Sequence, residues 1–86
     1  MKITIEYGPT HTNMDYAEWL EIDIIQRLSQ LDFLHLIDDR APELVTRDED
    51  IFEIKADNEL IFSKQALGRL PNGEDVVNYV VNNSLQ

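Results

Sequence analysis

The chain has 86 residues and a mass of 10.0 kDa, which is enough for one domain with a single hydrophobic core. Seventeen Asp and Glu against seven Lys and Arg give a formal net charge of −10, which disfavours binding to nucleic acids and to anionic membranes. The absence of cysteine excludes disulfides, thiolate nucleophiles and cysteine-ligated metal sites. Because no apolar run reaches the roughly 18 residues of a membrane span, and the N-terminus is typical of a strand and not of a signal peptide, we expect a cytoplasmic protein.

The first half of the chain predicts a strand and then a helix. Apolar and polar residues alternate over residues 2–7, which predicts a strand with one buried face, formed by Ile3, Ile5 and Tyr7. Residues 14–30 follow the period of a helix that lies on a sheet. Its apolar stripe consists of Ala17, Leu20, Ile24, Ile25 and Leu28. Residues 31–37 are the most hydrophobic run, and their periodicity is compatible with either a strand or a continued helix.

The second half predicts three strands and a final helix. Residues 43–47 have strand character, and an acidic turn follows at residues 48–50. Residues 51–64 form a hairpin, because the Asp and Asn at its centre tolerate the positive φ of a tight turn. A loop then leads to a helix over residues 74–83. This element order, β-α-(insertion)-β-β-β-α, predicts a two-layer α+β sandwich with both main helices on one face of a four-stranded mixed sheet.

Two stretches of the chain resemble the selenoprotein W-like (Rdx) branch of the thioredoxin-like fold. The first is MKITIEYGPTHT, where the family has a strand ending in Tyr and a Cys-x-x-Cys or Cys-x-x-selenocysteine loop. The second is IFEIKADNELIFSKQALGRLP, where the family has a Phe-containing strand, a hairpin, an Ile-Phe-Ser-Lys strand and a Gly-Arg-Phe-Pro-like loop. The resemblance implies a single thioredoxin-like domain over residues 1–86, with an insertion around residues 31–42.

This chain departs from the family at the redox site. Aligned on the family loop, Gly8 takes the place of the attacking cysteine, and His11 takes that of the second cysteine or selenocysteine. Residues 47–50 (RDED) replace a segment that is usually rich in glycine. Thiol–disulfide exchange needs a thiolate, which neither glycine nor imidazole supplies. The resemblance therefore implies the family fold without its redox chemistry, and we expect no enzyme activity and no cofactor.

The residues of the altered loop form the first candidate binding site. This site consists of Gly8, Pro9, Thr10, His11, Thr12 and Asn13. Backbone N–H groups and hydroxyls at a helix N-terminus can bind a partner, an anion or a small ligand, with His11 as an additional contact. The same residues can instead only cap the helix by accepting its first N–H groups. The sequence is compatible with both interpretations.

Apolar residues outside the predicted helix stripe form the second candidate site. Trp19 and Ile22 point away from the stripe, and the insertion adds further large apolar side chains. The set consists of Trp19, Ile22, Phe33, Leu34 and Leu36. Either the insertion folds over the outer face of the helix as a satellite core, or the set is an exposed patch that binds another protein or a second copy of this chain.

The remaining titratable residues indicate no chemistry of their own. No metal-ligand spacing such as H-E-x-x-H is present, so we predict no metal site and expect His35 to be a partly buried structural residue. These observations favour a redox-inactive protein-binding or adaptor module. The alternative hypothesis is a small-ligand or anion binder, or a minor enzyme, that uses the His11 loop.

Overall fold

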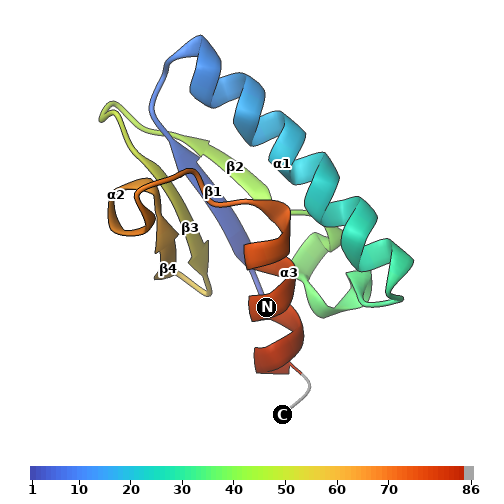
Figure 1. The fold of residues 1–86 in the computed structure, drawn as a ribbon. Helices are drawn as coiled ribbons and strands as arrows, with labels where there is room; N and C mark the ends of the chain where they lie inside the picture. The colour runs from blue at the N-terminus through green and yellow to red at the C-terminus, as the bar shows by residue number, and fades with distance from the viewer. Residues whose placement is uncertain (85–86) are drawn as a thin grey trace.

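Residues 1–84, which the computed structural model describes, form a four-stranded mixed sheet with helices on one face (Figure 1). The predicted α+β architecture and the predicted order of strands and main helices are confirmed. In chain order the elements are β1 (Ile3–Tyr7), α1 (His11–Gln30), the 3-10 turns η1 (Leu34–Leu36) and η2 (Asp38–Arg40), β2 (Glu43–Thr46), β3 (Phe52–Ala56), β4 (Glu59–Ser63), α2 (Lys64–Leu67) and α3 (Gly73–Ser84).

β1 is a central strand, because the order in the sheet is β2-β1-β3-β4. It runs parallel to β2 and antiparallel to β3, and β4 is antiparallel to β3. All five residues of β1 are buried, including Thr4 and Glu6 on the face that carries no helix. The prediction of a single buried face was therefore wrong for β1, because the side chains of Arg47 and Lys55 reach over Glu6.

α1 begins at His11, earlier than the predicted start at residue 14. Thr10 is its N-cap, and the Thr10 hydroxyl accepts a hydrogen bond from the N–H of Asn13 at 3.1 Å. The predicted stripe faces the sheet and is fully buried, except for Ile25, which is half-buried. α1 and α3 pack side by side over the sheet (Figure 1).

The C-terminus of α1 is a hydrogen-bonded turn that the sequence pattern did not indicate. Asp32 lies in the left-handed region with a φ of 60°. The N–H of Phe33 donates to the carbonyl O of Leu28 at 2.8 Å, and the N–H of Asp32 donates to that of Ser29 at 3.1 Å. These two bonds are the Schellman arrangement, in which glycine usually occupies the position that Asp32 has here.

The insertion is neither the strand nor the continued helix that we considered. It leaves α1 at the turn of Asp32 and forms the short 3-10 turns η1 and η2. The N–H of Asp38 donates to the carbonyl O of Met1 at 2.8 Å, which joins this segment to the beginning of the chain. Ile37 is buried in the core. The half-buried residues that pack against the core are Phe33, Leu34 and Leu36.

The hairpin of β3 and β4 has the predicted tight turn, with φ values of 51° at Asp57 and 70° at Asn58. Alternate residues of β3 are buried, namely Phe52, Ile54 and Ala56. α2, which was not predicted, is a single turn directly after β4, and the Ser63 hydroxyl caps it by accepting from the N–H of Ala66.

α3 begins at Gly73 and completes the layer of helices. Val76, Val77 and Val80 are buried, whereas Val81 is half-buried. Within residues 1–84, none of the helices combines the length and the apolar composition that crossing a membrane requires.

Candidate functional site

The loop between β1 and α1 is closed against the acidic turn of residues 48–50. The N–H of Gly8 donates to the carbonyl O of Ile51 at 2.8 Å. A Cβ atom at Gly8 would lie 2.5 Å from the carbonyl O of Glu49 and 2.9 Å from the Cα of Asp50. Both neighbours are backbone atoms, so a side chain at this position requires the whole turn to move. Cysteine at residue 8 is therefore incompatible with the acidic turn in its present place.

Asp50 also fastens the turn to the first helix. The Nδ2 of Asn13, a buried residue, donates to the Oδ1 of Asp50 at 3.3 Å. This contact places a carboxylate beside the first turn of α1, where the positive end of the helix dipole favours negative charge. An incoming anion at this helix end would meet that carboxylate. Thr10 is a helix cap, as one of the two interpretations predicted, and His11 is exposed.

The six predicted loop residues divide by burial. Gly8 and Asn13 are buried and hold the loop against the acidic turn. The exposed members are Pro9, Thr10, His11 and Thr12. The loop thus exposes a small polar surface. Its backbone conformation is fixed by the contacts of Gly8 and Asn13 with residues 48–51.

The predicted apolar set is split in two. Trp19 and Ile22 lie on the outer face of α1, with exposed fractions of 52% and 53%. Phe33, Leu34 and Leu36 are half-buried and pack against the core. The expectation of one continuous patch was therefore wrong, because the turn at Asp32 directs the insertion towards the core at the C-terminal end of α1 (Figure 1). The insertion does not cover the two exposed residues, so it is not a satellite core above them.

Trp19 is the outer member of a row of aromatic rings. Its ring centroid lies 5.5 Å from that of Tyr16, and the Tyr16 ring lies edge-on at 5.4 Å to buried Phe52. The Tyr16 hydroxyl donates to the carbonyl O of Pro71 at 2.8 Å, and burial raises the pKa of Tyr16. These contacts hold one side of Trp19 in place while the other side faces solvent.

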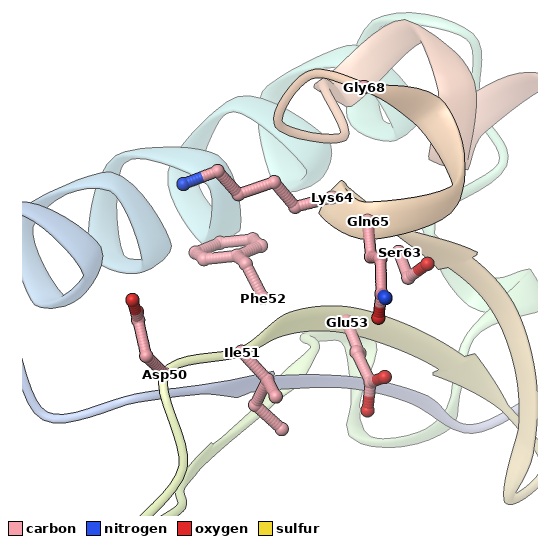
Figure 2. A pocket seen from close by; sticks show the side chains of 8 residues that line it. All are labelled: Asp50, Ile51, Phe52, Glu53, Ser63, Lys64, Gln65 and Gly68. Carbon is pink, nitrogen blue, oxygen red and sulfur yellow. The ribbon is translucent and has the colours of Figure 1, made fainter.

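A pocket of about 380 Å³ lies between the beginning of β3 and α2 (Figure 2). Figure 2 shows the ring of Phe52 in its interior, with the side chain of Lys64 extending beside the ring and the carboxylate of Asp50 at one end. The lining residues are Asp50, Ile51, Phe52, Glu53, Ser63, Lys64, Gln65 and Gly68. Sequence reasoning missed this pocket because it needs α2, and a four-residue helix has no periodicity to detect.

The sheet face without helices carries a charged cluster that was also missed. Buried Glu6 contacts Arg47 at 2.9 Å and Lys55 at 3.0 Å. The hydrogen bond from Arg47 holds the pKa of Glu6 below its usual value, although burial acts in the opposite direction and Lys55 adds to the lowering. Glu6 was expected to face solvent, and only the order of the strands reveals that two cations lie over it.

The prediction that His35 is a partly buried structural residue was wrong. His35 is exposed, because η1 turns its neighbours Leu34 and Leu36 towards the core and leaves the imidazole outside. Within residues 1–84, no three His, Asp or Glu side chains are grouped so that they could hold a metal ion.

The model of the Rdx family matches residues 2–82 of this chain. Among solved structures, the chain is similar to the crystal structure of a selenoprotein W-related protein from Vibrio cholerae, with a TM-score of 0.65 and 20% sequence identity. The similarity covers 95% of this chain and 96% of that chain, so the two share a fold over nearly their whole length. No curated protein matches this chain.

Proposed function

The chain belongs to the Rdx family, and from this premise we propose that it is a redox-inactive member that acts by binding another protein. The position that the resemblance assigns to the attacking cysteine is Gly8, whose backbone neighbours leave no room for a side chain. Thiol–disulfide exchange requires a thiolate, and this chain has no cysteine to supply one. The proposal therefore retains the family fold as a scaffold and not as a redox centre.

The observation that carries the proposal is the pair Trp19 and Ile22 on the outer face of α1. They are three positions apart and therefore adjacent on the helix surface, and each is about half exposed. Trp is the residue type that contributes most often to binding hot spots, since it buries a large area and loses little entropy when its ring is already held. The contact with Tyr16 holds this ring before a partner arrives.

The charges around this pair indicate the chemistry of the partner. Asp15 and Glu18 are exposed on α1 close to the pair. Arg27, the arginine of this helix, is engaged by Asp23 at 2.9 Å. We therefore assign to the partner an apolar pocket for Trp19 surrounded by Lys or Arg side chains, because opposite charges around an apolar contact favour association and its specificity.

The alternative, an anion site at the His11 loop, has weaker support. Its helix N-terminus already faces the carboxylate of Asp50, which repels a second anion. The cation whose charge acts on Tyr16, and so lies near Trp19, is Arg69, and Asp75 already pairs with it at 2.8 Å.

The test is to identify a partner in native cell extract and to repeat its binding with purified components. We expect Trp19→Ala and Ile22→Ser each to raise the dissociation constant at least about tenfold. Leu31→Ser is the matched control, because Leu31 is 50% exposed at the C-terminal end of the same helix. If all three variants bind the purified partner as tightly as the wild type does, the surface around Trp19 and Ile22 is not the binding site. If only Leu31→Ser binds more weakly, the binding site lies at the C-terminal end of α1 instead.

A further inference from the structure

The two edges of the sheet differ in how well they are protected from pairing with another chain. β2 is four residues long, follows Pro42 and carries Glu43 in an ion pair with Lys2. Proline, charge and short length are the usual devices that protect an edge strand. β4 instead presents the apolar run Leu60-Ile61-Phe62, and Leu60 is 49% exposed. Figure 1 shows β4 at the open edge of the sheet, with α2 at one end of it.

A groove of about 260 Å³ lies beside this exposed leucine. Among the described residues its lining comes from the edge strand β4 and from α2. The lining residues are Leu60, Ile61, Phe62, Ser63, Ala66 and Leu67. Leu60 lies opposite Lys55 in the register of the hairpin and therefore projects on the face without helices. One edge thus carries both a protruding apolar residue and an apolar groove that could receive one.

The charges at the two ends of β4 are opposite. Glu59 begins the strand and Lys64 follows its last residue. Within residues 1–84, five of the seven Lys and Arg form ion pairs, whereas Lys64 and Arg40 form none. A lysine without an ion pair is notable in a chain with seventeen carboxylate side chains. In an antiparallel pair of two identical strands, the Glu59 end of one strand lies beside the Lys64 end of the other.

From these three features we infer that β4 is the interface of a homodimer, in which two copies of this chain pair their edge strands antiparallel about a two-fold axis. Such an interface is self-complementary by symmetry, as the protruding leucine, the groove and the two charges require. The register skips Ile61, which is a β-bulge, so regular backbone pairing is short and side chains supply most of the contact. This surface is separate from Trp19 and Ile22, so the dimer leaves the proposed partner site accessible.

The molecular mass in solution tests this inference. We expect sedimentation equilibrium to show a shift from 10.0 kDa towards twice that mass as the protein concentration rises from micromolar to millimolar. Leu60→Lys should raise the dimer dissociation constant at least about tenfold, because it places a charge in the groove of the other copy. The matched control is Leu31→Lys, which alters an equally exposed leucine at the end of α1 and should dimerise as the wild type does. A wild-type chain that stays monomeric at millimolar concentration overturns the inference, as does equal weakening by both variants.

A charge exchange separates this interface from general effects of charge. Glu59→Lys makes the chain two units less negative and so reduces the repulsion between copies, yet it should weaken the dimer because two lysines then face each other. Lys64→Glu should weaken it as well, and the double variant, which has the net charge of the wild type, should restore it. If Glu59→Lys strengthens the dimer, bulk charge governs the association and the β4 pairing is rejected.

Discussion

At Gly8 the backbone requires glycine and glycine is present, whereas at Asp32 the backbone favours glycine and an aspartate is present. Gly8 is required for space, because its neighbours Glu49 and Asp50 approach it with backbone atoms. Asp32 occupies a left-handed conformation with a φ of 60°, which glycine adopts without the steric cost of a Cβ. A side chain at residue 8 should therefore lower the stability of the fold, whereas glycine at residue 32 should raise it.

We expect Gly8→Ala to lower the free energy of unfolding by about 1–3 kcal/mol, since the added Cβ forces the acidic turn away from the loop. Urea denaturation followed by circular dichroism measures this difference. Thr12→Ala, at an exposed position of the same region, is the control and should be nearly neutral. An unchanged stability of Gly8→Ala would mean that the turn yields easily and does not exclude a side chain.

We expect Asp32→Gly to raise the free energy of unfolding by about 0.5–1 kcal/mol, because it relieves the left-handed strain and removes a negative charge from the C-terminal end of α1. For a domain of this size that corresponds to a rise of about 2–8 °C in Tm. Asp32→Asn removes the charge and keeps a side chain, so thermal unfolding of both variants separates the two causes. A lower Tm for the glycine variant would contradict the steric part of the explanation.

At the scale of elements, the sequence predicts best where the determinants are local. The hairpin turn follows from Asp57 and Asn58 alone, and the apolar stripe of α1 follows from its spacing. The insertion could not be predicted, because its path depends on an aspartate in a glycine position and on the contact between Asp38 and Met1. The burial of Glu6 likewise depends on which strands flank β1, which a single sequence does not reveal.

The candidate site was predictable to a similar degree. The outward positions of Trp19 and Ile22 follow from helical period, whereas their exposure was one of two alternatives that the sequence left open. The assignment of Phe33 to the same patch was wrong, since it needed the direction in which the chain leaves α1. The pocket beside Phe52 was missed because one of its walls is α2, a four-residue helix that is too short to show a periodicity.

The charged cluster on the open face of the sheet predicts a pH dependence. Because the folded-state pKa of Glu6 is lowered, its carboxylate contributes stability above its unfolded value near 4.5 and loses that contribution as the pH falls through the folded-state value. We expect Glu6→Gln to lower the free energy of unfolding by about 1–2 kcal/mol at pH 7. The difference from the wild type should shrink in denaturation experiments below pH 4.5.

The exposed ion pair of Lys2 and Glu43 provides the control for this experiment. Both side chains are about half exposed, so Glu43→Gln should leave the free energy of unfolding almost unchanged at pH 7. If Glu6→Gln lowers the free energy of unfolding as little as Glu43→Gln does, hydration stabilises Arg47 and Lys55 as much as their contacts with the Glu6 carboxylate do.

At the scale of the whole molecule, the net charge of −10 is spread over a domain with a radius of gyration of 12.1 Å. Repulsion among so many carboxylates destabilises the folded state, and salt screens it over about 8–10 Å at ordinary ionic strength. We expect Tm to rise by a few degrees between low salt and about 0.5 M NaCl, with the same rise in KCl. A fall in Tm would mean that the screened ion pairs outweigh the screened repulsion.

Because of the position of Trp19, the intrinsic fluorescence of this protein reports on the proposed binding surface. It is the single tryptophan of the chain, and its indole is about half exposed on a helix that also carries the exposed carboxylates Asp15 and Glu18. Collisional quenchers of fluorescence that carry opposite charges should therefore differ, with caesium reaching the indole more readily than iodide because the local potential is negative. Emission from one native side chain thus measures the electrostatic field at the proposed binding surface, without any label that would alter it.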